Sequence, residues 1–240
     1  MKIYAQMYSV REACEDNFEK ALTDIAAMGY SGVEFAGYYG MELQPLKSLM
    51  DSLGLETLSA HVSLELLQND LENQLNYLKV LGAKYIVCPW TDMNSVISAR
   101  DYSLTLSEIG KKTALAGLPL LYHNHAHEFE VDQDSLPLEV FFDEIDQATV
   151  RQEPDVYWIA HAGLDVKAYL QAHKDRIPVV HLKQIENMLT KKNVAAHEGI
   201  LDFKAIMALL PEADYVYEQE FSDGTVMADM KTSLDYLNKY

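Results

Sequence analysis

The sequence is poor in cysteine and has no long hydrophobic run. Its two cysteines, Cys14 and Cys88, lie far apart and form no CxxC pair, so neither a disulfide framework nor a cysteine-based zinc site is indicated. No segment approaches the roughly 18 apolar residues of a membrane-spanning helix. Arg11 and Glu12 interrupt the N-terminal segment before the apolar core of a signal peptide could be complete. These absences predict a cytoplasmic protein that does not associate with a membrane.

Basic residues are also scarce, because 19 Lys and Arg stand against 37 Asp and Glu and give a net charge of −18. Proteins that hold nucleic acid through its phosphates need charge of the opposite sign. Nucleic acid and anionic membranes are therefore not expected as partners. The hydrophobic share of 49% and the charged share of 23% are ordinary for a folded protein, which excludes disorder as the main description.

The chain has neither a GxGxxG nor a GxxxxGK[ST] motif, which argues against the main competing fold, an open doubly wound sheet. Instead, short β-rich runs alternate with helical patterns along the whole chain, with no linker that would mark a boundary. The expected strands are Lys2–Met7, Gly32–Phe35, Glu56–His61, Lys84–Cys88, Leu118–Asn124, Val150–Val156, Ile177–Leu182 and Asp214–Glu218.

Strands that alternate with helices predict right-handed crossovers and a parallel sheet. Eight such units in 240 residues predict an α/β fold, a single (β/α)8 TIM barrel that occupies residues 1–240. Among the helices, Asp16 followed by Glu19 predicts the start of the first one. Leucines at helical spacing from Leu64 to Leu78 predict one continuous helix, which Gly82 ends.

In such a barrel the active site lies at the C-terminal ends of the strands. The polar or aromatic residues expected there are Glu34, His61, Trp90, His123, His125, Glu128, Asp155, His181, Lys183 and Glu218. Carboxylates and imidazoles that converge from several strands are ligands for Mn²⁺, Co²⁺, Mg²⁺ or Zn²⁺. The sequence therefore predicts a site for a divalent metal ion.

Other interpretations of single residues stay open on the sequence alone. Glu34 and His61 can equally be packed residues at strand ends, and Tyr122 and Trp158 are expected to pack rather than to take part in chemistry. The histidine-rich run after the fifth strand can be no more than a polar loop, and its spacing does not decide which of its side chains touches a metal.

Five motifs carry a resemblance to a known family when they are taken together and in order. They are LLYHNHAHEFE, EPDVYWIAHAG, RIPVVHLK, HEGILDF and VYEQE. The chain resembles the sugar phosphate isomerase/epimerase group of xylose-isomerase-like TIM barrels, which also contains tagatose-type epimerases and inosose dehydratases. The resemblance follows the strand–helix order of the whole chain, and its specific motifs lie in the second half.

The resemblance implies a divalent metal, with Mn²⁺ preferred, held by Asp155, His181 and Glu218. The epimerases usually supply a glutamate inside the fifth strand, where this sequence has Leu121. Glu128 is taken as the replacement ligand, with His123 and His125 as the next candidates.

The family's chemistry implies a metal-dependent isomerase or epimerase that acts on a ketose or a sugar phosphate through an enediolate. Glu218, as ligand and base, and His123 or His125 are the expected catalytic residues. The residues expected to bind substrate are Glu34, His61, Trp90 and Lys183.

The alternatives are a dehydratase or lyase acting on a keto-polyol or 3-keto-glycoside, and a non-catalytic sugar-binding barrel. The superfamily also contains zinc-dependent nucleases, which the acidic charge disfavours. A small carbohydrate is the expected partner, and the sequence leaves open whether the chain forms a homo-oligomer.

Overall fold

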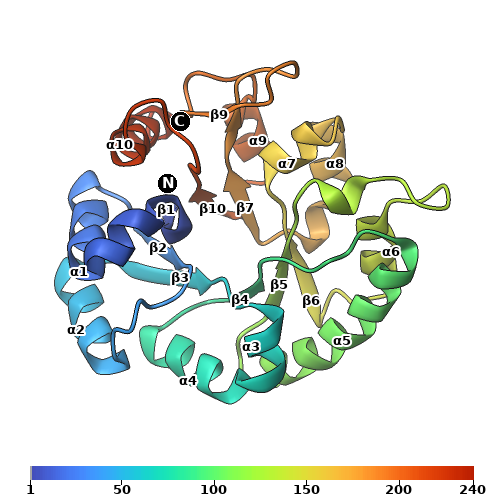
Figure 1. Cartoon of the computed structure of the whole chain (residues 1–240), viewed down its shortest axis with the longest axis horizontal. Helices are drawn as coiled ribbons and strands as arrows, with labels where there is room; N and C mark the ends of the chain where they lie inside the picture. Colours follow the sequence, from blue (N-terminus) through green and yellow to red (C-terminus); the bar gives the residue numbers. More distant parts are fainter. Residues whose placement is uncertain (1) are drawn as a thin grey trace.

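The computed structural model describes residues 2–240, whose strands enclose a barrel with helices around it (Figure 1). The strands of the barrel are β1 (Ile3–Gln6), β2 (Gly32–Phe35), β3 (Glu56–Ala60), β4 (Ile86–Cys88), β5 (Leu120–His123), β6 (Val150–Glu153), β7 (Val179–Leu182) and β10 (Asp214–Tyr217). They pair in parallel as β3-β2-β1-β10-β7 and as β4-β5-β6. The bridges His61↔Val87 and Asp155↔His181 join the two sheets at both seams. The predicted (β/α)8 barrel is confirmed.

Helices follow the strands and cover the outside of the barrel (Figure 1). They are α1 (Arg11–Met28), α2 (Leu43–Leu53), α3 (Leu64–Asn69), α4 (Leu71–Leu81), α5 (Val96–Leu115), α6 (Pro137–Asp143), α7 (Val156–His161), α8 (Val166–His173), α9 (Phe203–Leu209) and α10 (Val226–Leu237), with short 3-10 turns η1 (Met7–Val10), η2 (His127–Phe129) and η3 (Lys174–Arg176). Within residues 2–240, no helix is long and apolar enough to cross a membrane.

Inward-pointing side chains of the strands form an apolar layer inside the barrel. Its buried side chains are Tyr4, Leu58, Val87, Leu121, Val179 and Val216. Because side chains of a strand point to one face at every second residue, the next inward positions lie one step nearer the C-terminal ends of the strands. On four strands these positions are polar, namely Gln6, His123, His181 and Glu218. The barrel thus carries a polar layer directly on top of an apolar one.

The first helix starts earlier than the sequence predicts. It begins at Arg11, directly after η1, and not at Asp16. A helix start nevertheless occurs close to the predicted position. Asn17 leaves helical geometry (φ −159°, ψ 96°), and its Oδ1 accepts a hydrogen bond from the backbone N–H of Lys20 at 2.9 Å. Asn17 therefore caps the second half of a kinked helix, one residue after the predicted cap.

The leucine repeat forms two helices and not the single helix that its spacing predicts. Asp70 (φ −139°, ψ 25°) separates α3 from α4, and its carboxylate accepts hydrogen bonds from the side chains of Asn73 and Gln74. Helical spacing of apolar residues continues across such a break because both halves pack on the same core. The predicted end at Gly82 is confirmed, since this glycine has φ +77°.

Two elements near the mouth of the barrel were not predicted. The helix α7 begins at Val156, inside the segment expected as strand, and the side chain of Asp155 caps it by accepting from the N–H of Tyr157 at 2.8 Å. A short antiparallel hairpin, β8 (Gln184–Ile185) with β9 (Asn193–Val194), follows β7.

Gly110 allows α5 to approach the start of β6 closely. A Cβ atom at this position would overlap the carbonyl group of Thr149, whose carbon would lie 2.9 Å away. Gly110→Ala should gain about 1 kcal/mol of helix propensity. We nevertheless expect a net destabilisation of about 1–3 kcal/mol, because the overlap forces the helix away from the strand. Urea denaturation followed by circular dichroism measures this change.

Leu115→Ala is the matched control, because Leu115 lies on the same helix and is 91% exposed. Its effect should stay within about 0.5 kcal/mol. A Gly110→Ala protein more stable than the parent would contradict the steric argument.

Candidate active site and metal centre

Titratable side chains from six strands meet at the C-terminal end of the barrel interior. Among residues 2–240, two overlapping groups place their possible ligand atoms within 4.8 Å of one another. The first group is His61, His123, Glu153 and His181, and the second is His123, Asp155, His181 and Glu218. All of these residues except His61 are buried.

His181 lies at the centre of the cluster and uses both of its ring nitrogens. Nδ1 lies 2.7 Å from Glu218 Oε2, while Nε2 lies 2.7 Å from Glu34 Oε1 and 3.0 Å from Glu153 Oε1. Burial alone would favour the neutral ring, but the surrounding carboxylates outweigh it and raise the pKa of His181 well above its usual range. The imidazole therefore bridges two sets of acids.

Glu34 is fully buried below His181 and does not stand open to a substrate. Its Oε1 accepts from Gln6 Nε2 at 2.7 Å and lies 3.0 Å from His61 Nε2, and its Oε2 accepts from the hydroxyl of Ser59. Burial opposes ionisation of Glu34, but His61 and His181 hold its pKa below the ordinary value. In return, and against its own burial, Glu34 helps to raise the pKa of His61 to about 9.

The residues of the second group fit a divalent cation. In the described part of the chain, Asp155 Oδ2 is buried without a hydrogen-bond partner, and buried His123 Nδ1 lies 3.3 Å from Glu153 Oε1 without hydrogen-bond geometry. Buried polar atoms without a partner are costly, and a cation that accepts both lone pairs removes that cost. Two carboxylates and two imidazoles are also a donor set that such metals take.

Burial is the largest cause of the pKa shifts of Asp155 and His123. It raises the pKa of Asp155 to about 7, although the charge of Lys183 opposes this. It also lowers the pKa of His123 well below the usual value, and the charge of His181 adds to this effect. A neutral His123 can donate a lone pair to a metal ion.

Lys183 is the buried cation of the site, with 1% of its surface exposed. Its ammonium lies 3.4 Å from Glu218 Oε1 and 3.9 Å from Asp155 Oδ2, and it also donates to Glu220. Burial disfavours the charged amine, but these carboxylates raise its pKa further above 10.5. It also lies over the ring of Trp158, 4.7 Å from the centroid. Lys183 thus neutralises part of the acid cluster.

A cavity of about 440 Å³ opens above the cluster, within the range of small-molecule sites. His61, His123, His125 and Glu218 line its floor, together with the aromatic side chain of Trp90. These five residues come from the sequence-predicted set, and the structure brings them together around one space.

The structure places Glu128 away from both ligand groups. Its carboxylate accepts from the hydroxyl of Tyr122 at 2.9 Å and from the N–H of His125 at 2.8 Å. Burial raises the pKa of Glu128. In the part of the chain that the structure describes, the place beside Asp155, His181 and Glu218 belongs to His123.

Glu153 is the site residue that the sequence reasoning missed. It is fully buried on β6, and its Oε1 lies 3.1 Å from His61 Nε2 and 3.3 Å from His123 Nδ1. The signal was present, because Glu153 precedes Asp155 by two residues and a strand places such neighbours on one face.

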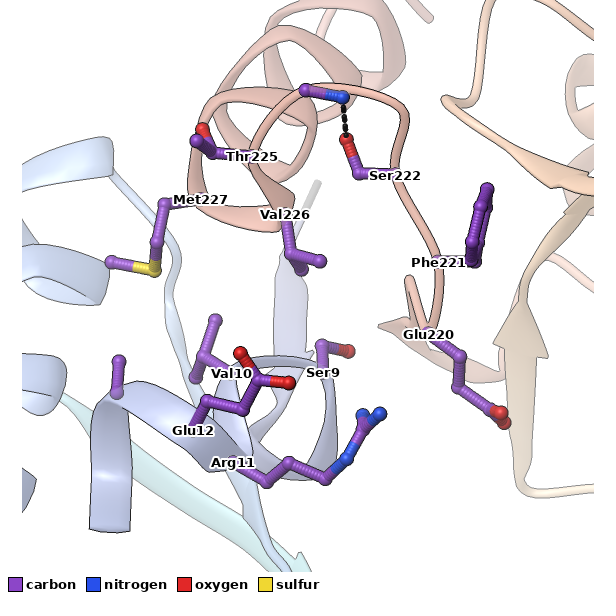
Figure 2. A pocket seen from close by; sticks show the side chains of 12 residues that line it. Ser9, Val10, Arg11, Glu12, Glu220, Phe221, Ser222, Thr225, Val226 and Met227 are labelled. Atoms are coloured by element: carbon purple, nitrogen blue, oxygen red, sulfur yellow. Dashed lines mark hydrogen bonds between the residues drawn. The ribbon is translucent and has the colours of Figure 1, made fainter. Parts of the chain in front are cut away.

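A second cavity, of about 450 Å³, lies between the start of α1 and the segment before α10 (Figure 2). Arg11, Ser222 and Thr225 line it, and Glu220 stands at its edge. Arg11 donates to the backbone carbonyl of Tyr8 at 3.0 Å and stacks on that ring. This cavity holds none of the clustered ligand residues.

Comparison with known proteins establishes the family. Residues 22–240 match the family described as the xylose isomerase-like TIM barrel, and the protein therefore belongs to it. Inosose dehydratases from Clostridium perfringens and Geobacillus thermodenitrificans are each 25% identical to the chain over 240 aligned residues, which cover 84% of this chain and 80% of each relative.

Solved structures agree with this fold. A sugar phosphate isomerase/epimerase from Parabacteroides distasonis has a TM-score of 0.86 and 24% identity, and the match covers 100% of this chain and 99% of that one. The IOLI protein, whose crystal structure holds a zinc atom, has a TM-score of 0.78 and 15% identity, with 100% and 97% covered. The family that the five motifs indicated is confirmed.

Metal binding can be tested directly. We expect the purified protein to bind a divalent ion and, with free metal at about 100 times Kd, to gain about 2.7 kcal/mol in unfolding free energy. Asp155→Asn should weaken binding by more than the roughly 10–100-fold loss seen when only a supporting residue is changed. Isothermal titration with Mn²⁺, Co²⁺ and Zn²⁺ gives the affinities. Asp101→Asn, an exposed acid on α5, should bind like the parent, and equal affinities in the two variants would contradict the site.

The role of Lys183 can be tested without metal. Lys183→Met leaves Asp155, Glu218 and Glu220 without their buried counter-charge, and we expect the metal-free protein to lose about 3–5 kcal/mol of stability. Added divalent cation should recover part of this loss, because it neutralises the same acids. Chemical denaturation with and without metal measures both effects.

Lys192→Met is the control, since Lys192 pairs with Asp223 at the surface and should matter much less. If both lysine variants lose the same unfolding free energy, the buried charge of Lys183 does not contribute more to stability than an exposed one.

Proposed function

We propose that the protein is a metal-dependent isomerase or epimerase that acts on a ketose or a sugar phosphate. The observation that carries this proposal is the paired arrangement of the site. Two members of a donor set for a divalent cation, His123 and Glu218, line a cavity, and aromatic residues line the same cavity. Aromatic rings suit the C–H face of a sugar, while the polar floor suits its carbonyl and hydroxyl groups.

In this proposal His123, Asp155, His181 and Glu218 hold the cation, with Mn²⁺ as the preferred ion. When bound, the cation supplies positive charge where the substrate oxygens become negative. Support comes from the partnerless atoms of Asp155 and His123, as far as residues 2–240 are concerned. His181 is held in place by the acids on its other nitrogen.

We assign the proton transfer to His125. Its Nδ1 is buried and has no partner among the residues described, and its ring lies at the cavity, 5.3 Å from that of Trp158. Burial lowers the pKa of His125 to about 3, so the ring is neutral in the free protein. Glu218, in contrast, is occupied by His181 and Lys183. His125 would remove the proton next to the carbonyl and return it.

A dehydratase is the second candidate, because the Clostridium and Geobacillus relatives are inosose dehydratases. Removal of the same proton, followed by loss of a hydroxyl from the next carbon, gives dehydration instead of epimerisation. The histidine that this chain has at the end of β5 also favours this alternative over an epimerase with a glutamate there.

Proton exchange tests the proposal. The Mn²⁺-loaded protein is incubated in D₂O with ketoses, ketose phosphates, an inosose and 3-keto-glycosides, and NMR follows the proton next to the carbonyl. Deuterium incorporation with an isomeric product supports an isomerase or epimerase, and an unsaturated product supports the dehydratase. Exchange on none of these compounds would refute the enzymatic proposal.

Variants separate metal binding from proton transfer. His125→Gln should lower the exchange rate by roughly 10²–10⁴-fold while Mn²⁺ affinity stays close to that of the parent. Asp155→Asn should lose both properties. His197→Gln is the control, since His197 lies at the surface. If His125→Gln exchanges as fast as His197→Gln, the assignment of the proton transfer to His125 is wrong.

A further inference from the structure

A third cavity adjoins the cavity of about 440 Å³ that opens above the metal-ligand cluster. It measures about 470 Å³ and is lined by Tyr157, Trp158, Lys183, Asn193 and Phe221, among others. Trp158 and Glu220 line both cavities, so the two spaces meet at these side chains. Each is by itself within the roughly 300–1,000 Å³ of a small-molecule site.

We propose that this third cavity is a subsite for a second sugar ring, so that the substrate is a keto sugar joined to another ring through a glycosidic oxygen. The inference rests on the proposed function, because it assumes that the keto sugar occupies the cavity over the metal-ligand cluster. That cavity is accordingly the keto subsite, and the third cavity is the outer subsite.

The free surfaces of the outer subsite suit a neutral ring. Phe221 is 50% exposed and follows Glu220 on the segment after β10, and both residues line the outer subsite. Tyr157 and Trp158, whose ring centroids lie 4.7 Å apart, also line it. Aromatic walls of this kind offer apolar contact area to the C–H face of a sugar.

The lysines of the outer subsite argue against a phosphate as its occupant. Lys191 donates to the backbone carbonyl of His161 at 2.7 Å, and Lys192 pairs with Asp223. Lys183 is neutralised by Glu218 and Glu220. Each ammonium thus already has a protein partner, and an anion would have to compete with it.

Trp158 lines both subsites and also carries a donor without a partner in the described part of the chain. Its Nε1–H is buried and, within residues 2–240, has no acceptor. A buried donor without a partner costs free energy, and an oxygen of a bound substrate would satisfy it. The sequence suggested only a packing role for Trp158, whereas its position on both subsites gives it a role in recognition.

The test compares three ketoses that differ only at one oxygen. Isothermal titration of the Mn²⁺-loaded protein is carried out with D-fructose, with isomaltulose, which is fructose carrying a glucosyl group on O6, and with fructose 6-phosphate. We expect isomaltulose to bind about tenfold more tightly than fructose, since the second ring adds aromatic contacts. Isomaltulose that binds no more tightly than fructose, or not at all, would overturn the proposal. Tighter binding of the phosphate would overturn it in favour of an anionic occupant.

Two aromatic variants show where the gain arises. Phe221→Ala should weaken isomaltulose binding roughly three- to tenfold and change fructose affinity much less, because Phe221 lines the outer subsite and not the keto subsite. Trp90→Ala, which changes only the keto subsite, should weaken both ligands by the same factor. If Phe221→Ala leaves isomaltulose binding unchanged, the outer subsite is refuted.

Failure of this inference is distinguishable from failure of the proposed function. Deuterium exchange on keto sugars without preference for the second ring would remove the outer subsite and keep the enzyme. Selective binding of isomaltulose by a protein that exchanges no proton would keep the subsite and remove the enzyme.

Discussion

The arrangement of the site depends on the balance of charge inside the barrel. Four carboxylates, on Glu34, Glu153, Asp155 and Glu218, are buried together, and an unpaired buried charge is very costly. The protein meets this cost in two ways. Histidines 61 and 181 and Lys183 supply positive charge close to the acids. Asp155 instead has a pKa of about 7, which shows that the local compensation is incomplete there. In the proposed function, a divalent cation beside Asp155 would complete the balance.

The strand period explains how such a cluster can exist in a stable fold. Tyr4, Leu121, Val179 and Val216 close the lower barrel with apolar contacts, and the residues two positions later form the polar layer. The acids therefore rest on a packed floor and not in open water. The same two-residue period places Leu121 in the apolar layer and not in the layer of the possible ligands. A strand-five glutamate at Leu121 would lie in the apolar layer, one step below the level at which His181 and Glu218 act, whereas His123 lies at that level.

Much of this could be predicted from the sequence, and the remainder has physical causes. The barrel follows from eight alternating units, and Asp155, His181 and Glu218 follow from their places at strand ends. The break at Asp70 left no trace in the leucine pattern, because both helices keep the same buried face. Glu128 was chosen to replace the glutamate that the epimerases have in the fifth strand, but its oxygens accept hydrogen bonds from Tyr122 and from the backbone of His125. Trp158 was taken for packing because no sequence pattern reports that two cavities meet at one side chain.

The two nitrogens of His181 favour one position for the cation over the other. On the Nε2 side, Glu34 and Glu153 both lie within hydrogen-bond distance, and Gln6, Ser59 and His61 satisfy Glu34 further. That side is already rich in hydrogen bonds, although Glu153 Oε2 has no partner among residues 2–240. On the Nδ1 side, Asp155 Oδ2 has no hydrogen-bond partner among the residues that the structure describes. A cation on the Nδ1 side would displace the proton that Nδ1 shares with Glu218 Oε2, and the acids at Nε2 would then hold the ring with its Nδ1 lone pair toward the cation. In the proposed site, His61, Glu34 and Glu153 would therefore support His181, and Asp155 and Glu218 would contact the cation.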